Sequence, residues 1–368
     1  MNRNRVQQNA TLPIDSLVSF ANTLHHLTED QSLEKNNSYA ALLKENADVH
    51  MWSNITLTLS SMGGGPFAFL SASPLMQDNY STTTINFENG KILATARFLF
   101  GEALSRVMEK HEVPNLTKDV FNRIPPNDVA GVLAWNFNPE TIREFFTAAG
   151  INPDNYLKQY NTSLDQIVKS TNGQLIFSLS PRNGKSNPDP ANSLSMMPMP
   201  LDVNAFLSIS VKDKTSFDQL LSLLKGLFIG EERAAQLKIP YKINNEWFAI
   251  GTSTKQVDSF MLGSSYSHSF TDRITGDPVG GYIDINKLVA TAPHDMFDSS
   301  QISLAKNTWE DIIIKGGRFK DRSMSLHAEI NLVDKSTNSL KQIGKFMSDM
   351  RMLEEQKSES TNKTATAY

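Results

Sequence analysis

The stretch TTTINFENGKILATARFLF, residues 82–100, decides the fold class of this chain. Two runs rich in β-branched and aromatic residues flank Glu88-Asn89-Gly90. An Asn-Gly pair favours the tight turn of a two-stranded hairpin, because both residues tolerate positive φ. A helical run follows at about 102–111. The stretch therefore predicts an antiparallel hairpin followed by a helix, a unit typical of α+β proteins.

The same order of elements recurs later in the chain. The hairpin and helix around Thr84 resemble those around Ile313, and the strand after Asp48 resembles the strand after Asp277. Both blocks are separated by the same number of residues, which favours an internal duplication over chance. A third strand-then-helix block lies at 128–146. We interpret the chain as two related α+β units rather than a solenoid of short repeats.

A long segment without periodicity separates the two units. PRNGKSNPDPANSLSMMPMP at 181–200 is rich in Pro, Asn and Ser, a composition typical of loops. We predict a first α+β unit at 1–180 with a helical N-terminus, a second unit at 201–355, and a disordered polar tail at 356–368. The predicted class is α+β, with antiparallel or mixed sheets covered by helices, since the hairpins lack the strict strand–helix alternation of a parallel sheet.

The composition excludes several classes of protein. The formal charge is −4, from 35 basic and 39 acidic residues, whereas nucleic-acid-binding proteins normally carry a basic surplus. We therefore expect no nucleic-acid partner. The chain has no cysteine, which excludes disulfides, thiolate metal sites and cysteine nucleophiles. No apolar run approaches the ~20 residues of a transmembrane helix, and the first residues lack the apolar centre of a secretory signal.

The sequence contains partial matches to motifs for catalysis and cofactor binding, but each match lacks the structural context or the partner motifs that its function requires. The segment 63–68 satisfies G-x-G-x-x-A, but FAFL follows its proline and favours a strand, where a dinucleotide site needs a helix N-terminus. S-x-x-K occurs three times without the partner motifs of acyl-transfer enzymes. None of the seven histidines forms H-E-x-x-H. We predict no cofactor and no catalytic or metal-binding residue.

Two kinds of side chain remain as candidates for binding. The four tryptophans fall in or beside predicted strands, where we expect core packing; an exposed surface for stacking sugars is the alternative. They are Trp52, Trp135, Trp247 and Trp309. Met196, Met197 and Met199 lie in the long loop, where exposed thioethers would suit partner binding, unless the loop folds back and buries them. We predict these three methionines as partner-binding residues.

Several stretches, taken in order over residues 14–347, carry a family resemblance. They are SLVSFANTLHHLTEDQSL, ENADVHMWSNI, TTINFENGKI, IPPNDVAGVLAWNFNPETIREFF, NGQLIFSLS, INNEWFAIGTS, ITGDPVGGYIDINKL and AEINLVDKSTNSLKQI. The chain resembles an uncharacterised family of cell-envelope lipoproteins from Bacteroidetes, known as a domain of unknown function. The resemblance implies a periplasmic or outer-membrane-attached protein. Family members begin with a lipoprotein signal, an acylated cysteine and a further strand-rich region. The first residues of this chain resemble the middle of a family member, so the resemblance predicts that Met1 is an internal start or a boundary.

These observations favour a non-enzymatic cell-envelope protein that binds a protein partner or a polymer such as a glycan. The alternative is an enzyme that acts on envelope glycans or peptides through carboxylates, and a purely structural role is a third. A broad exposed apolar or Met-rich patch would favour binding. Two carboxyl groups roughly 5–9.5 Å apart in a cleft beside exposed aromatic residues would favour the enzyme.

Overall fold

The computed structural model describes residues 14–26, 28, 32–61, 73–125, 129–182, 202–224, 239–263, 265–292 and 297–365. The chain divides into two compact units, Met1–Asn46 and Ala47–Tyr368. The first unit contains α1 (Ile14–His25), a 3-10 turn and α2 (Asn37–Leu42). The apolar spacing over residues 14–46 predicts a helical N-terminus, and the structure has separate helices there instead of one. The side chains of Ser32 and Asn36 accept backbone N–H groups and start new helical turns.

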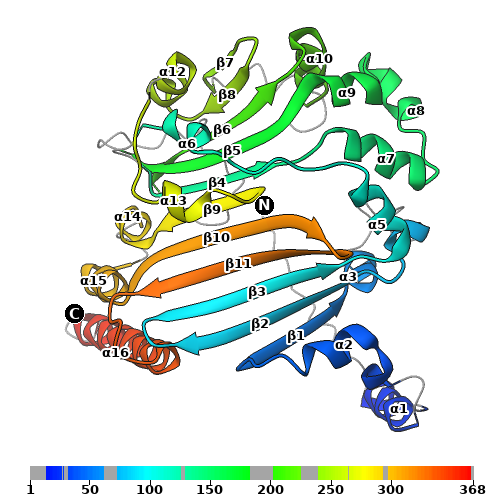
Figure 1. Cartoon of the computed structure of the whole chain (residues 1–368). Coiled ribbons are helices and arrows are strands. Elements are labelled where there is room, and N and C mark those ends of the chain that lie inside the picture. The colour runs from blue at the N-terminus through cyan, green and yellow to red at the C-terminus, as the bar shows by residue number, and fades with distance from the viewer. Residues whose placement is uncertain are drawn as a thin grey trace, which may run out of the picture. The chain divides into compact units, whose positions relative to one another are not determined.

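The second unit is built on one sheet. Its eleven described strands lie in the order β1-β2-β3-β11-β10-β9-β4-β5-β6-β8-β7, and every neighbouring pair is antiparallel (Figure 1). The α+β class is confirmed, with a single large antiparallel sheet where we expected several sheets. The predicted loop at 181–200 connects β5 and β6, which pair directly. The division of the chain at this loop stays a prediction.

The strands and helices of this unit have the following bounds. The strands are β1 (Val49–Asn54), β2 (Tyr80–Glu88), β3 (Lys91–Leu99), β4 (Gly131–Asn136), β5 (Thr171–Pro181), β6 (Val203–Val211), β7 (Tyr241–Ile243), β8 (Trp247–Gly251), β9 (Val279–Asp284), β10 (Trp309–Lys320) and β11 (Ser323–Leu332). The helices are α3 (Ile55–Ser61), α5 (Glu102–Glu109), α6 (Lys118–Asn122), α7 (Glu140–Ala148), α8 (Asp154–Leu157), α9 (Leu164–Ser170), α10 (Lys214–Leu224), α12 (Thr254–Leu262), α13 (Thr271–Ile274), α14 (Ile285–Val289), α15 (Ser299–Thr308) and α16 (Ser339–Ala365).

The hairpin predicted at 82–100 is present as β2 and β3. Gly90 has a φ of 69°, whereas Asn89 does not have a positive φ, so only one of the two turn residues adopts the conformation expected for the primed turn. An added Cβ at Gly90 would lie 3.0 Å from the carbonyl oxygen of Asp334. The hairpin of β10 and β11 turns at Asp321 and Arg322, which both have positive φ. Local turn chemistry therefore places both hairpins where the sequence predicts them.

Two segments differ from the sequence-based expectation. We expected the strand after Asp48 to continue to Leu59, but β1 ends at Asn54 and α3 begins at once. The Asn54 side chain accepts the backbone N–H of Leu57 at 3.2 Å and so caps the new helix. At the other end of the chain, α16 continues to Ala365, into the segment for which we expected disorder.

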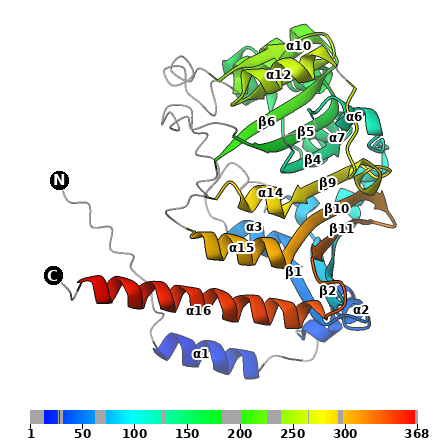
Figure 2. The same ribbon diagram turned by 90° about the vertical axis from the view of Figure 1, so that its left-hand side faces the viewer.

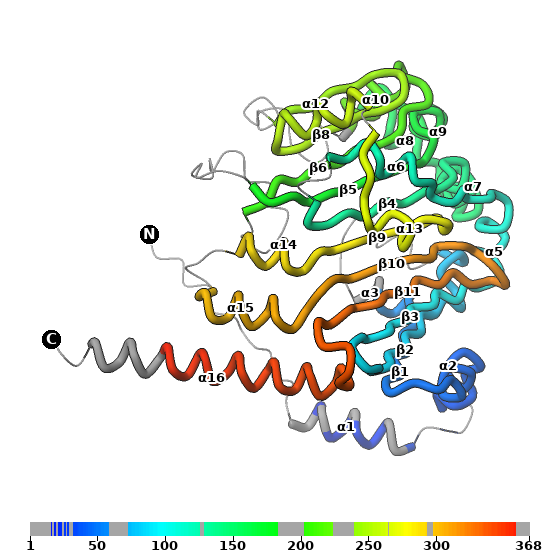
Figure 3. Tube along the Cα trace, turned by 60° about the vertical axis from the view of Figure 1, so that its left-hand side comes forward, coloured from blue at the N-terminus to red at the C-terminus, as the bar shows by residue number. Residues whose placement is uncertain are grey.

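The main core lies on one side of the sheet, under α6, α12 and α13. Alternate residues of an antiparallel strand point to opposite faces, and on this face the strands contribute fully buried apolar side chains. The core includes Phe121, Val132, Ala134, Ile176, Phe206, Phe260, Phe270 and Ile274. Figures 2 and 3 show that α14, α15 and α16 leave the sheet together, toward one side.

Candidate functional site

The face of the sheet opposite the main core is apolar from one edge to the other. Residues that pair directly across an antiparallel sheet point to the same face, so the strand register defines rows. One row crosses all eleven described strands and consists of Val49, Ile85, Ala94, Ala328, Ile314, Gly281, Leu133, Phe177, Leu207, Ile250 and Tyr241. We call the face that carries this row the apolar face.

Two further rows lie on the same face, one on each side of the first row. Each is displaced from the first row by two residues along every strand. One consists of Met51, Thr83, Ala96, Leu326, Gly316, Val279, Trp135, Leu175, Ile209, Phe248 and Ile243. The other consists of Phe87, Ile92, Ile330, Ile312, Ile283, Gly131, Leu179 and Ala205. None of the side chains in these three rows is charged.

Strand β4 shows how unusual this face is. Val132 and Ala134 point into the core and are 3% and 0% exposed, whereas Leu133 and Trp135 point the other way and are 40% and 50% exposed. A strand with one solvated face ordinarily places polar residues there. Because β4 lies inside the sheet rather than at its edge, these exposed apolar side chains make this face a candidate interaction surface.

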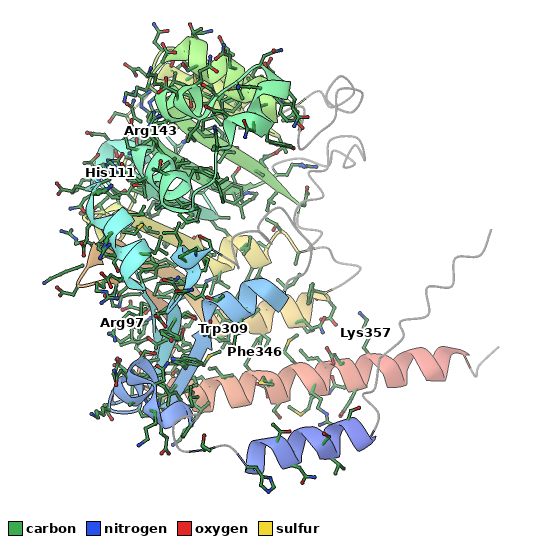
Figure 4. The ribbon with its side chains drawn as sticks, turned by 90° about the vertical axis from the view of Figure 1, so that its right-hand side faces the viewer. Arg97, His111, Arg143, Trp309, Phe346 and Lys357 are labelled. Carbon is green, nitrogen blue, oxygen red and sulfur yellow. The ribbon has the colours of Figure 1, made fainter. Side chains whose placement is uncertain are left out.

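Helices cover the apolar face near its two ends. At the β6–β8–β7 end, α10 packs Phe217 against Phe248, with ring centroids 5.3 Å apart, inside a small cluster that includes Ile209. At the other end, Phe346 of α16 meets Trp309 edge to face at 5.7 Å (Figure 4). Trp309 pairs with Leu332, which lies two residues beyond Ile330 of the apolar face. Helix α14 lies on the same side of the sheet as α16 and contacts β5, β9 and β10 (Figure 2). Between α10 and α14, the apolar side chains Leu133 and Trp135 of β4 are exposed.

Charged side chains gather on the core side of the sheet instead. Arg273 of α13 donates two hydrogen bonds to the buried carboxylate of Asp311, at 2.6 and 3.1 Å. The amide of Asn331 donates to Asp311 at 2.8 Å and to Glu329 at 3.0 Å. The hydrogen bond from Arg273 to Asp311 raises the pKa of the guanidinium. This network ties α13 to β10 and β11, and its carboxylates are occupied as acceptors, as in a structural ion pair.

Beside this network lies a column of stacked rings. Phe270 stacks on Tyr282 at 4.5 Å and on His268 at 4.8 Å. Burial is the main reason that the pKa of Tyr282 rises to about 12. His268 Nε2 lies 2.8 Å from the carbonyl oxygen of Ile124 and 3.1 Å from that of Phe121, so this nitrogen carries the proton. Burial lowers the pKa of His268, and the charge of Lys287 adds to this effect.

We expect His268 to make the folded state less stable in weak acid. Burial favours the neutral imidazole in the folded protein, whereas the unfolded chain binds a proton near pH 6.5. The free energy of unfolding should therefore fall below about pH 6.5 and level off once the folded-state pKa is passed. Urea unfolding of the wild type and of His268→Gln at pH 7.5 and 5.5 tests this. Gln donates a similar hydrogen bond but does not titrate, so an equal pH dependence in both proteins would contradict the assignment.

The structure gives the location of some of the predicted binding residues but not of others. Met196, Met197 and Met199 lie outside the described residues. Trp247 is buried in the main core, as we expected for tryptophans in strands. Trp135 is not a core residue, and this expectation was wrong for it. The run Gly131–Asn136 is apolar at four consecutive positions, a pattern that signals a strand with two apolar faces, and this signal could have identified the site.

The described residues also limit other kinds of site. Among them, no group of three or more His, Asp or Glu side chains is placed to hold a metal ion. Within the same part of the chain, no helix has the length and hydropathy needed to cross a membrane. Comparison of this chain with protein-family models, with curated proteins and with solved structures finds no match.

Proposed function

We propose that this protein is a non-enzymatic protein of the cell envelope that binds a protein partner through the apolar face. The observation that carries the proposal is the exposure of Leu133 and Trp135 on an inner strand whose other side is fully buried. Each Å² of apolar surface left in water costs about 25 cal/mol. A partner that covers these side chains recovers that free energy, which makes the face a favourable place for association.

The envelope location rests on the resemblance of the quoted stretches to cell-envelope lipoproteins. The family's acylated cysteine would supply membrane attachment, and this chain has no cysteine of its own. Detection of the native protein in membrane or periplasmic fractions, rather than in the cytoplasm, tests the location independently of any binding partner.

We also propose that the sheet arose from related units. In the first, β1 and α3 precede the hairpin β2–β3 and α5; in the second, β9, α14 and α15 precede the hairpin β10–β11 and α16. The strand order supports this pairing, because β1-β2-β3 is followed by β11-β10-β9, and the units meet antiparallel at β3 and β11. A third unit, with β4 before the hairpin β5–β6 and α10, continues the sheet from β9.

The carboxylate-based enzyme is the weaker candidate. Asp311 and Glu329 lie close together, because both accept from the amide of Asn331. Asp311 is buried and also accepts two hydrogen bonds from Arg273. A carboxyl group that must exchange a proton with a substrate needs a free oxygen within reach of it. The exposed aromatic side chain that we would pair with such a site, Trp135, lies on the opposite face of the sheet.

Photo-crosslinking in intact cells tests the proposed function. We expect a photo-reactive amino acid at position 133 to capture a defined protein, and the same group at position 327 to fail, because His327 is exposed on the other face. The captured protein is then purified and titrated with the wild type, Leu133→Asp and the control His327→Asp.

Leu133→Asp should weaken binding of the purified partner by at least about tenfold, since it buries a charge without a counter-ion, while His327→Asp changes binding by less than about twofold. Urea unfolding of both variants checks that they remain folded. Equal capture at both positions, or binding that Leu133→Asp leaves intact, would rule out the apolar face as the partner site.

A further inference from the structure

We propose that the partner segment is an amphipathic α-helix that packs on the apolar face across β9, β4 and β5, beside α10 and α14. This inference rests on the proposed function and adds the secondary structure and polarity of what is bound. The bound segment must form its backbone hydrogen bonds within itself and must present one apolar side. It must also fit the space beside the helices that already cover the face.

The hydrogen bonding of the sheet excludes an extended segment from this position. Each inner strand pairs with a neighbour on both sides, so its backbone N–H and C=O groups are already used. The three rows of the apolar face contain few hydrogen-bonding side chains: Thr83 of β2, the indole N–H of Trp135 on β4 and the hydroxyl of Tyr241 on the edge strand β7. An extended peptide would bury its own backbone groups against this face without partners, at a cost of about 1–3 kcal/mol each. A helix satisfies its backbone groups internally.

Helices of the protein itself already pack on other parts of the apolar face. At the β6–β8–β7 end, α10 places Phe217 and Leu221 against Phe248 and its neighbours. At the far end, α16 reaches Trp309 through Phe346. Helices α14 and α15 lie beside α16 and contact β10. A further helix between α10 and α14 would complete a layer of helices on the sheet, which is the usual way that proteins cover an apolar sheet face. Continuity with this layer favours a helix over other occupants.

The dimensions of the open strands suit one helix. A helix with its side chains is about 10 Å wide, and neighbouring strands are about 4.8 Å apart, so one helix spans roughly the width of β9, β4 and β5. The side chains that it would meet are Leu133, Trp135, Leu175 and Phe177. None of them is charged. The bound helix must therefore carry apolar residues at a spacing of three and four, with its charges on the outer side.

A second copy of the same sheet is a poorer occupant. Figure 2 shows that α15 and α16 project far from the sheet on one side, and α16 alone has 27 residues, or about 40 Å of helix. Phe346 joins α16 to this face at Trp309. Two copies would have to bring their apolar faces to within about 10 Å to form a sandwich, and the projecting helices obstruct that approach.

Two labelled peptides of identical composition test the inference. Both contain 18 residues of leucine and lysine; one places leucine at helical spacing and the other alternates leucine with lysine as in a strand. Fluorescence anisotropy at 0.15 M salt measures binding to the whole protein, and circular dichroism follows the helix content of the bound peptide. Dodecanoate is added as a probe for hydrocarbon chains. Leu133→Asp is compared with the wild type and with His327→Asp.

We expect the helical peptide to bind at least tenfold more tightly than its strand-patterned isomer. Leu133→Asp should weaken this binding tenfold or more, and His327→Asp less than twofold. Equal binding of both peptides, lost in Leu133→Asp, would overturn the helix but leave the proposed function standing. Binding of dodecanoate alone, lost in Leu133→Asp, would overturn both in favour of a hydrocarbon ligand. Helical-peptide binding that Leu133→Asp leaves unchanged would overturn the inference by placing the contact elsewhere, for example on a segment of the chain that folds over the face.

Discussion

Replacing Gly173 by alanine is expected to lower the free energy of unfolding by about 2–5 kcal/mol. Gly173 has a φ of 80°, a conformation that an L side chain adopts only at a cost. The new Cβ would also overlap the carbonyl oxygen of Phe137 and lie 2.9 Å from its carbonyl carbon. That carbonyl belongs to the backbone, so it cannot move aside as a flexible side chain can, and the cost of the left-handed backbone adds to the cost of the overlap.

This glycine matters to the candidate site because it lies where β5 joins the sheet. The register between β5 and β6 shifts between Thr171 and Leu175, and Gly173 lies inside that irregularity. Its carbonyl accepts the backbone N–H of Phe137 at 2.7 Å, directly after β4. Two residues further along, Leu175 pairs with Trp135 on the apolar face. A displaced Gly173 would therefore disturb the pairing that places Trp135.

Gly150→Ala is the matched control for this prediction. Gly150 also has a positive φ, of 68°, but an added Cβ would meet no atom within 4 Å. Gly150→Ala should lower the free energy of unfolding only by the cost of a left-handed backbone conformation, about 1 kcal/mol. Urea unfolding of the two variants, analysed with a common slope, gives the comparison. If Gly173→Ala loses no more stability than Gly150→Ala, the close approach to Phe137 does not exist in solution.

Phe121→Ala should lower the free energy of unfolding by about 3–5 kcal/mol. The Phe121 side chain is fully buried, and its ring meets Phe270 edge to face at 6.3 Å. Phe270 in turn stacks on Tyr282 of β9. Removing the ring leaves a cavity between α6 and the sheet, because the helix and the stacked rings can collapse into it only in part.

Trp135→Ala provides the contrast, since it removes a larger ring from the other side of the same sheet. Trp135 is 50% exposed, so its loss should cost clearly less stability than the loss of Phe121. It should instead weaken binding of the helical peptide. Both variants are compared by urea unfolding and by peptide titration. If Trp135→Ala destabilises the protein as much as Phe121→Ala, then Trp135 is packed in solution and the open apolar face is incorrect.

Phe121→Ala and Trp135→Ala distinguish the contribution of one sheet face to stability from the proposed contribution of the other face to binding. One face holds the chain together through Phe121, Phe270 and the strands beneath them. On the other face, Leu133 and Trp135 are exposed to solvent. We expect these two side chains to contribute little to folding and, in the proposed function, much to association. Because the strands are shared, a rigid core on one side keeps the binding residues of the other side in a fixed register, which reduces the entropy lost on binding.

Features that depend on neighbouring residues could be predicted from the sequence alone. Asn89-Gly90 predicted the β2–β3 turn. The run at 203–211, rich in apolar residues, predicts a strand with the bounds of β6, and the segment that begins at Ser253 predicts a helix, which is α12 with Ser253 as its cap. Asn138 likewise accepts the backbone N–H of Glu140 at the start of α7. These signals act within a few residues, through backbone conformation and local hydrogen bonds, so no distant contact is needed to read them.

The order of the strands and the choice of the covered sheet face depend on tertiary contacts that no local sequence pattern specifies. The pairing of β3 with β11 joins residues from opposite ends of the chain, and no local pattern specifies it. In β4 the apolar run makes both faces equally suitable for burial, so the position of α6, α12 and α13 determines that Val132 is buried and Leu133 is exposed. Which apolar face is buried depends on which face the helices pack against. The helices and the strands that they cover are far apart in sequence, so local patterns do not specify this choice.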